Sequence, residues 1–338
     1  MVKKSLCGLT AEEIYNLISP SGFNLSHAVS ITNSIYKKRR EEISGFAKIP
    51  QKLRDELESF SFSGIFQPAA YEISADKTVK YLFRTDTGKE YETVCIPDAK
   101  RNTICVSTQS GCRMGCRFCA TARYGFRGNL TAGEIINQVI SLPDAEKITH
   151  VVFMGMGEPM DNIENVLKAC EILTAEWGLA LSPRNVTVST VGLTSGVETF
   201  LRSSLCNLTL SLGSPFAEER KSVVPAEFHY PVYTIIEMMK RYPREKKRRF
   251  SLAYVMINAW NDSDSHLEEL KILVGSSGIR VNLLPYHPVT NDPNTSSSSE
   301  RMQYFKHNLI VSGISASVRK SRGSDISAAC GLLAAGLK

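Results

Sequence analysis

Cys112-Arg113-Met114-Gly115-Cys116-Arg117-Phe118-Cys119 is the most informative segment of the chain, because it places three cysteines at spacings of four and three. Three thiolates this close can face one point if the chain loops around it, and Gly111 and Gly115 favour such a loop. A structural zinc site takes four protein ligands, whereas an iron–sulfur cluster can leave one iron open. The spacing favours a cluster held by Cys112, Cys116 and Cys119. A zinc knuckle with a distant fourth ligand, or three unrelated thiols, are the alternatives.

The composition is that of a soluble globular protein, with 43% hydrophobic and 22% charged residues in a chain of 338. This length suits one large domain and a smaller one. No apolar run is long enough to cross a membrane, and the N-terminus lacks the apolar core of a signal peptide. We therefore expect a cytoplasmic protein without membrane contact, whose nine cysteines serve metal binding or catalysis rather than disulfides.

Positive charge is clustered, although the formal net charge is only +6. One basic block is Lys37-Lys38-Arg39-Arg40, and a second runs from Arg241 to Arg249 with a single Glu245. Such blocks can contact RNA phosphates through an attraction that does not depend on sequence. A solvated helix end or loop is the alternative for each block.

The first hundred residues predict two different units. Residues 1–70 read as a small helical accessory domain that binds RNA; Thr10 and Glu13 stand in capping-box order before its first apolar stripe. Residues 71–100 predict a β-hairpin linker, because strand formers at 79–84 and 91–97 flank the turn signal Asp86-Thr87-Gly88.

From residue 101 to 338 the chain alternates strand and helix, which implies parallel strands with right-handed crossovers. About six such units are too few to close an eight-unit barrel, so an open, partial (β/α)6 barrel is expected. Chemistry in parallel barrels collects at the C-terminal ends of the strands. The cysteine loop, Gly155 to Pro159, Ser189 and Ser211 all fall at such ends.

The cysteine spacing resembles the signature of the radical-SAM superfamily, whose [4Fe–4S] cluster binds S-adenosylmethionine (SAM) at its open iron. Gly155-Met156-Gly157-Glu158-Pro159 resembles the glycine-rich segment after the second strand of that superfamily. The resemblance implies that Gly157 lets the backbone approach the methionine part of SAM, and that Glu158 binds its ammonium group.

Longer segments resemble the RlmN/Cfr family of RNA methyltransferases in particular. The resemblance covers about residues 90–332 and extends more loosely into the helical N-terminus. It is carried by Cys105–Cys112, Phe153–Pro159, Ser182–Thr190 and Arg322–Gly331.

The family resemblance assigns roles that the residues alone do not suggest. It implies that one SAM methylates Cys330, that a second SAM on the cluster yields a radical that activates this methyl group, and that the carbon adds to adenine. It also implies that Glu92 accepts a proton and that Cys105 forms a transient disulfide with Cys330. Taken alone, Cys105 and Cys330 read as inert packed thiols, as do the remaining cysteines: Cys7, Cys95, Cys170 and Cys206.

The resemblance also implies SAM contacts at the ends of later strands. Two of these positions depart from the family pattern. Where the family usually has Ser-Leu-His, this chain has Ser211-Leu212-Gly213, and where Tyr-Asn-Pro is usual it has Tyr286-His287-Pro288. Gly213 removes a side-chain contact, whereas His287 keeps a hydrogen-bonding group. The implied contacts of SAM, beyond Gly157 and Glu158, are Ser189, Ser211, Leu212, Gly213 and His287.

Methylation of carbon 2 of an adenosine in 23S ribosomal RNA is the expected activity, because Pro159 and residues 318–323 resemble the RlmN branch. Transfer RNA is a possible further substrate of this branch. The alternatives are carbon-8 methylation, as in the Cfr branch, and a diverged RNA- and cluster-binding relative that no longer transfers methyl. The expected partners are RNA and an electron donor such as flavodoxin or ferredoxin, and the protein is expected to be a monomer.

Overall fold

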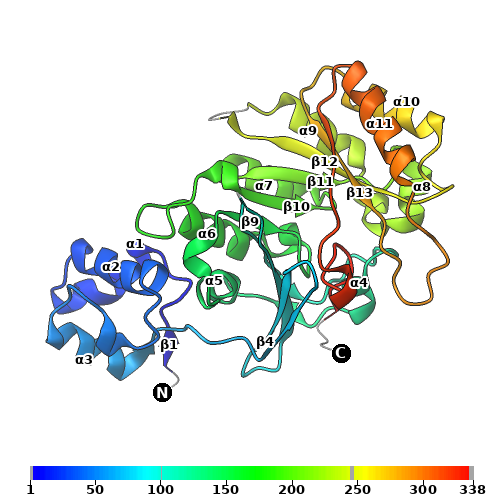
Figure 1. Ribbon diagram of the computed structural model, residues 1–338. Coiled ribbons are helices and arrows are strands. Elements are labelled where there is room, and N and C mark those ends of the chain that lie inside the picture. Colours follow the sequence, from blue (N-terminus) through cyan, green and yellow to red (C-terminus); the bar gives the residue numbers. More distant parts are fainter. Residues whose placement is uncertain (1–2, 100, 244–246, 335–338) are drawn as a thin grey trace.

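In the computed structural model, which describes residues 3–99, 101–243 and 247–334, ten strands form one mixed sheet (Figure 1). Seven neighbouring strands are parallel and three at one edge are antiparallel. The parallel strands are β6 (Thr103–Cys105), β9 (His150–Phe153), β10 (Val186–Thr190), β11 (Asn207–Ser211), β12 (Phe250–Met256), β13 (Arg280–Pro285) and β14 (Ala316–Val318).

Helices join the parallel strands, so the sheet is the expected α/β partial barrel of six strand–helix units. A seventh parallel strand, β14, forms the edge of the sheet. Strand order follows chain order from β9 to β14, as short right-handed crossovers require. The helices of this part are α4 (Ala120–Tyr124), α5 (Ala132–Ile140), α6 (Ile163–Thr174), α7 (Thr194–Ser203), α8 (Ala217–Val223), α9 (Val232–Arg241), α10 (Asp264–Val274) and α11 (Ser299–Val311).

The antiparallel edge consists of β3 (Ala70–Ile73), β4 (Val79–Arg84) and β5 (Glu90–Ile96). The hairpin between β4 and β5 lies where the sequence predicts it. It does not simply link two units, because β5 also pairs with β6 and so extends the barrel sheet. The three antiparallel strands β3–β5 thus form a second wall of the barrel, and Glu92 lies on β5 of this wall.

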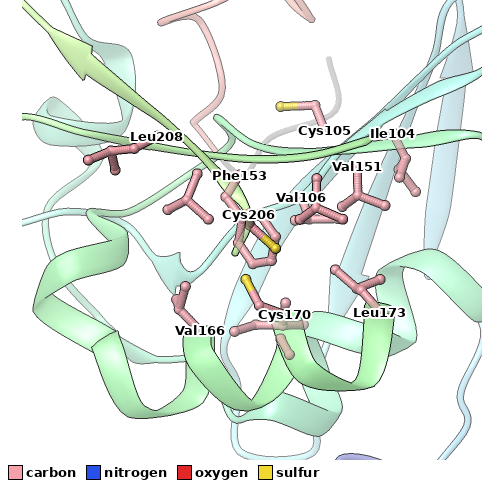
Figure 2. Close-up of a cluster of buried hydrophobic side chains, with 14 of the residues drawn as sticks. Ile104, Cys105, Val106, Val151, Phe153, Val166, Cys170, Leu173, Cys206 and Leu208 are labelled. Atoms are coloured by element: carbon pink, nitrogen blue, oxygen red, sulfur yellow. The ribbon is translucent and has the colours of Figure 1, made fainter. Parts of the chain in front are cut away.

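The core lies between the sheet and its outer helices. Apolar side chains of β6, β9 and β11 meet those of α6 (Figure 2). Among the residues in this layer are Ile104, Val106, Val151, Phe153, Val166, Leu173 and Leu208, all buried. Their burial on one face leaves the other face of the parallel strands to the site.

The N-terminal unit is helical, as expected, with α1 (Ala11–Ile18), α2 (Leu25–Thr32) and α3 (Gln51–Phe60). The predicted capping box is present, since Thr10 accepts from the Glu13 amide and Glu13 accepts from the Thr10 amide. Two short strands, β1 (Lys4–Ser5) and β2 (Ser61–Phe62), pair in parallel and tie the ends of this unit together.

The first basic block helps to attach this unit to the barrel. The Lys37 ammonium donates to the Glu176 carbonyl at 2.5 Å, and the Arg39 guanidinium pairs with Glu146 at 2.9 Å. In the second block, Arg248 is buried and donates to the carbonyls of Cys206 and Leu201. Arg244 and Lys246 lie outside the described residues. RNA contact by either block stays a prediction, and these residues also have structural roles.

None of the helices in the described ranges combines the length and the apolar character that a bilayer crossing requires.

Close backbone packing holds the N-terminal unit against α5. A Cβ atom built on Gly133 would lie 2.5 Å from the Cys7 carbonyl oxygen, well inside van der Waals contact. We predict that Gly133→Ala lowers the free energy of unfolding by about 1–3 kcal/mol, because backbone must move to make room. Urea unfolding of the wild type and of Gly133→Ala measures the difference in free energy.

Gly45→Ala is the matched control, because its added Cβ would meet only the flexible Arg40 side chain at 3.6 Å. Equal unfolding midpoints for the two variants would contradict the predicted packing at Gly133.

Candidate active site

The cysteine loop lies between β7 (Gln109–Ser110) and α4, at the end of the first parallel strand. Gly111 has a φ of +75°, and a Cβ there would lie 1.5 Å from the Gly125 carbonyl oxygen. Only glycine allows this crossing of two chain segments. The loop is further tied down by its own backbone, since the Arg117 amide donates to the Val223 carbonyl at 3.0 Å.

Cys112 and Cys116 are both affected electrostatically by the neighbouring Cys119. Burial raises the pKa of Cys112 to about 12. The pKa of Cys116 is raised well above its ordinary value by burial first, and then by Cys119 and Cys112. Across residues 3–99, 101–243 and 247–334, no three His, Cys, Asp or Glu side chains stand where they could hold a metal ion.

This donor set fits an iron–sulfur cluster. Burial and neighbouring thiols oppose the ionisation of Cys112 and Cys116, and a bound cation would favour their thiolate forms. Thiolate is also the ligand that Fe–S clusters use, and three of them leave one position for another ligand. Cys112, Cys116 and Cys119 are therefore the residues that would hold a cluster here.

A buried arginine supports the floor of this loop. Arg220 of α8 has no exposed surface and pairs with Glu227 at 2.5 Å. Its guanidinium also donates to three carbonyls at the ends of β10 and β11, those of Val191, Ser211 and Leu212. Its positive charge lowers the pKa of Cys116, although burial outweighs this effect. One side chain thus orders two strand ends beneath the cysteines.

Glu158 and Gly157 form the second loop of the site. Gly157 has a φ of +95°, and a Cβ there would lie 2.5 Å from Cβ of Gln109. The buried Glu158 carboxyl accepts from the Thr190 hydroxyl at 2.6 Å and from the Val191 amide at 2.9 Å. Burial raises its pKa to about 7 despite these donors. Glu158 therefore joins β9 to β10, and a carboxylate keeps room for a further donor such as an ammonium group.

The ends of β10 and β11 also meet. The hydroxyls of Ser189 and Ser211 lie 3.4 Å apart. Leu212 is fully buried in the core, and Gly213 has a φ of +74° with its carbonyl accepting from Asn261 at 2.8 Å. The left-handed backbone at Gly213 accounts for glycine at this position, where a histidine would be strained.

The C-terminal segment docks onto the cysteine loop (Figure 1, red beside α4). The Ala120 amide donates to the Gly331 carbonyl at 2.7 Å, and the Thr121 hydroxyl donates to the Leu333 carbonyl at 2.6 Å. Asp325 accepts from Ser74 at 2.6 Å in the turn that joins β3 to β4. The segment is thus held at both walls of the barrel.

This docking brings the C-terminal segment next to both Cys105 and Glu92. Figure 2 shows the Cys105 side chain on the opposite side of the sheet from Cys170 and Cys206. Burial, and then Cys330, raises the pKa of Cys105, and Cys119 in turn raises the pKa of Cys330.

Solvent reaches Cys330, while burial of Cys105 is nearly complete. Burial of the Cys330 thiol among protein atoms raises its pKa, and the positive charge of Arg319 lowers that pKa. Cys330 is an exposed residue that adjoins the end of the cysteine loop, because the carbonyl of the next residue, Gly331, accepts from the Ala120 amide.

Glu92 adjoins the same segment. It is buried, and its Oε2 accepts from the Ala334 amide at 2.9 Å. A glutamate in a strand usually faces solvent, but Glu92 is buried and the C-terminal segment contacts it.

A cavity of about 540 Å³ opens beside the cysteine loop. Its volume is in the range of small-molecule sites. Tyr286 lines this cavity. The ring Nε2 of the next residue, His287, lies 2.8 Å from the Ser321 hydroxyl. The other SAM contacts implied by the sequence resemblance are not among its described lining residues, which are Gly115, Cys116, Arg117, Phe118, Ala122, Arg123, Ser222, Val223, Ile257, Trp260, Tyr286 and Asn291–Asn294.

Residues 106–270 match the family model of the Radical SAM superfamily. The chain is 42% identical to a "Probable dual-specificity RNA methyltransferase RlmN" of Parabacteroides distasonis, over 98% of this chain and 96% of that protein. It is 35% identical to the dual-specificity RNA methyltransferase RlmN of Geobacter sulfurreducens, over 96% and 91% of the two chains. The chain belongs to the RlmN family of radical-SAM methyltransferases. The crystal structure of a radical SAM methyltransferase from Sphaerobacter thermophilus matches with a TM-score of 0.91 at 37% identity, covering 98% of this chain and 100% of that one.

Membership confirms the family and fold expected from the sequence, and it makes the protein a SAM-dependent methyltransferase. It implies a [4Fe–4S] cluster and SAM as cofactors. The donor set at Cys112, Cys116 and Cys119 fits that cluster. The individual roles of the other site residues stay predictions.

Sequence reasoning missed the residues that organise the site from behind. Arg220, Asp325 and Lys80 were not singled out. One local signal is the charge of Lys80 between apolar residues of the predicted strand 79–84, but it does not reveal the partners of Lys80. Their partners lie far away in the chain or across strands, so no local pattern reveals their importance.

The cysteines expected to be inert lie away from the site or in packed surroundings. Cys7 is buried, which raises its pKa to about 12. Cys170 and Cys206 face each other in the core layer outside the sheet (Figure 2).

Arg220→Met should destabilise the fold by about 3–5 kcal/mol, because it leaves the Glu227 carboxylate buried without its partner. Arg202→Met is the matched control. Arg202 also pairs with a glutamate, Glu198, but its side chain is 70% exposed, so we expect a change within about 0.5 kcal/mol. Urea unfolding of the two variants tests this, and a similar small effect in both would refute the proposed support by Arg220.

Glu158 should make stability depend on pH. Because its pKa is about 7 in the fold against 4.5 for the ordinary group, the folded chain holds a proton that the unfolded chain releases in this interval. Its contribution is complete below about pH 4.5 and is lost as the pH rises to about 7, on the order of 3 kcal/mol. Unfolding of cluster-free protein across this range should show the slope. Glu158→Gln should lack it, and Glu164→Gln, at an exposed position, should keep it.

Proposed function

We propose that this protein methylates carbon 2 of an adenosine in 23S ribosomal RNA, with transfer RNA as a second substrate. The observation that carries the proposal is the docking of the C-terminal segment, which is hydrogen-bonded through Gly331 to Ala120, next to Cys119, and through Ala334 to Glu92. A cysteine carrier at the cysteine loop suits a substrate carbon that does not accept methyl directly from SAM. The relatives are named as dual-specificity RNA methyltransferases, which supports two RNA substrates.

Each of the three residues has a distinct proposed task. Cys330 carries the methyl group, and its solvent exposure allows an RNA base to reach it. Glu92 accepts the proton that leaves the adenine ring. Cys105 then forms a disulfide with Cys330, which releases the product from the protein. When bound, the cluster and SAM supply the radical that activates the methyl group on Cys330.

Two SAM molecules are proposed for each turnover, one for methylation of Cys330 and one for the radical. We propose that Gly157, Glu158, Ser189, Ser211 and Gly213 contact SAM, and that the cavity beside Phe118, Trp260 and Tyr286 takes its adenosyl part. The aromatic rings at this cavity suit a purine. The protein is proposed to act as a monomer in the cytoplasm, with flavodoxin or ferredoxin as electron donor.

The test is an anaerobic assay with cluster-loaded protein, reductant, SAM and unmodified ribosomal or transfer RNA, followed by mass spectrometry of the nucleosides. We expect 2-methyladenosine. Cys330→Ala should lower its yield below detection because no carrier remains, and Cys105→Ala should trap a covalent protein–RNA adduct. Cys95→Ala is the control and should keep activity, because Cys95 lies on the face of β5 opposite to Glu92.

Three other outcomes would overturn the proposal in different ways. Formation of 8-methyladenosine would assign the activity of the Cfr branch. Cleavage of SAM without any RNA methylation would indicate a relative that has lost methyl transfer. A colourless protein that binds zinc instead of iron would exclude the radical mechanism altogether.

A further inference from the structure

A buried lysine lies next to the proposed proton acceptor. Lys80 of β4 has a side chain that is only 3% exposed, and its ammonium lies 3.4 Å from Oε1 of Glu92. On the other side, the same ammonium lies 3.1 Å from Oε2 of Glu72 on β3. Three charges thus form a row across β3, β4 and β5.

Strand register explains the row. Glu72 is directly opposite Lys80, whereas Glu92 is directly opposite Leu82, two residues beyond Lys80. A diagonal neighbour of this kind is within reach of a long side chain. The register of the hairpin therefore sets which carboxylate the lysine reaches.

The row does not serve stability alone. A buried ion pair is often no more stabilising than apolar residues of similar volume, because both charges lose their hydration. Exposure also differs along the row, at 25% for the Glu72 side chain and 1% for Glu92. Lys80 thus places its positive charge next to the more deeply buried carboxylate, that of Glu92, which is also the one that accepts from the C-terminal segment.

Glu92 has further described contacts besides Lys80. The Ala334 amide donates to Oε2 of Glu92, and the Ser107 hydroxyl donates to the Glu92 main-chain carbonyl at 2.5 Å. The thiols of Cys105 and Cys330 belong to the same site.

We propose that Lys80 is a positioning residue that keeps Glu92 ionised and directs its carboxylate at the RNA-bound carbon. The inference rests on the proposed function. In the step concerned, the C–H bond of the adenine carbon breaks, its proton passes to Glu92, and its electron pair stays in the RNA–protein adduct. Lys80 itself does not touch the RNA.

The experiment compares cluster-loaded wild type with Lys80→Met, Lys80→Gln and Lys80→Arg, on unmodified ribosomal RNA under anaerobic conditions. Both neutral variants should lower methyladenosine yield about a hundred-fold, the lower range expected of general-base catalysis. Methylation of Cys330, read from the mass of its peptide, should stay within about two-fold of wild type because that earlier step does not use Glu92. A covalent protein–RNA adduct should accumulate on denaturing gels.

The pH profile separates positioning from a structural effect. Without the neighbouring cation Glu92 holds its proton more strongly, so the rise of the rate with pH should move to higher pH in the neutral variants. Lys80→Arg keeps the charge and should recover at least about ten-fold of the lost yield. Lys89→Met is the matched control: Lys89 pairs with Glu134 at 2.7 Å in the same hairpin but does not touch Glu92, so no adduct should accumulate.

Several results would overturn the role of Lys80. These are equal activity of Lys80→Met and Lys89→Met, a parallel loss of Cys330 methylation and RNA methylation, an unchanged pH profile, or no recovery in Lys80→Arg. Should Lys80→Met fail to fold, Lys80→Gln carries the same expectations with a polar side chain. A wild type that forms no methyladenosine would refute the proposed function instead, and the inference with it.

Discussion

The structure of the site depends on the attachment of the C-terminal segment to both walls of the barrel. On one wall, backbone hydrogen bonds join Gly331 to the start of α4, directly after the cysteine loop. On the other wall, Asp325 accepts from the β3–β4 turn, and the Ala334 amide donates to Glu92. Cys330 lies between these anchors. Without them a cysteine in a segment rich in alanine and glycine would have no defined position, since so little side chain is available to order it.

The two walls have different physical origins. The parallel strands bring their C-terminal ends to one edge, so the cysteine loop, Glu158 and the serines of β10 and β11 gather there by topology. The antiparallel strands β3 to β5 add a wall that an ordinary partial barrel lacks, and this wall carries Glu92 and Lys80. Polar chemistry in this protein lies between the walls, whereas the apolar layer lies outside the sheet (Figure 2).

Buried charge marks the places where the fold is organised for the site rather than for stability. Arg220 donates to the carbonyls beneath the cysteine loop, and the Lys80 ammonium lies next to the Glu92 carboxylate. Each is fully or almost fully buried, which costs hydration energy that apolar residues would not lose. The basic block at Lys37 and Arg39 shows the opposite case. A surface feature that suggests RNA binding is partly used to attach the N-terminal unit to the barrel.

The sequence alone predicts the alternation of strands and helices, the cysteine loop with its three donors and, through resemblance, the family. These follow from local patterns: the apolar periodicity, the capping box at Thr10 and the spacing of Cys112, Cys116 and Cys119. The folded structure is needed to see that the hairpin extends the barrel sheet, that Glu92 is buried beside Lys80, and that Cys330 lies near enough to Cys105 to affect its pKa. These depend on strand register and on contacts between segments far apart in the chain, which no local pattern of residues contains.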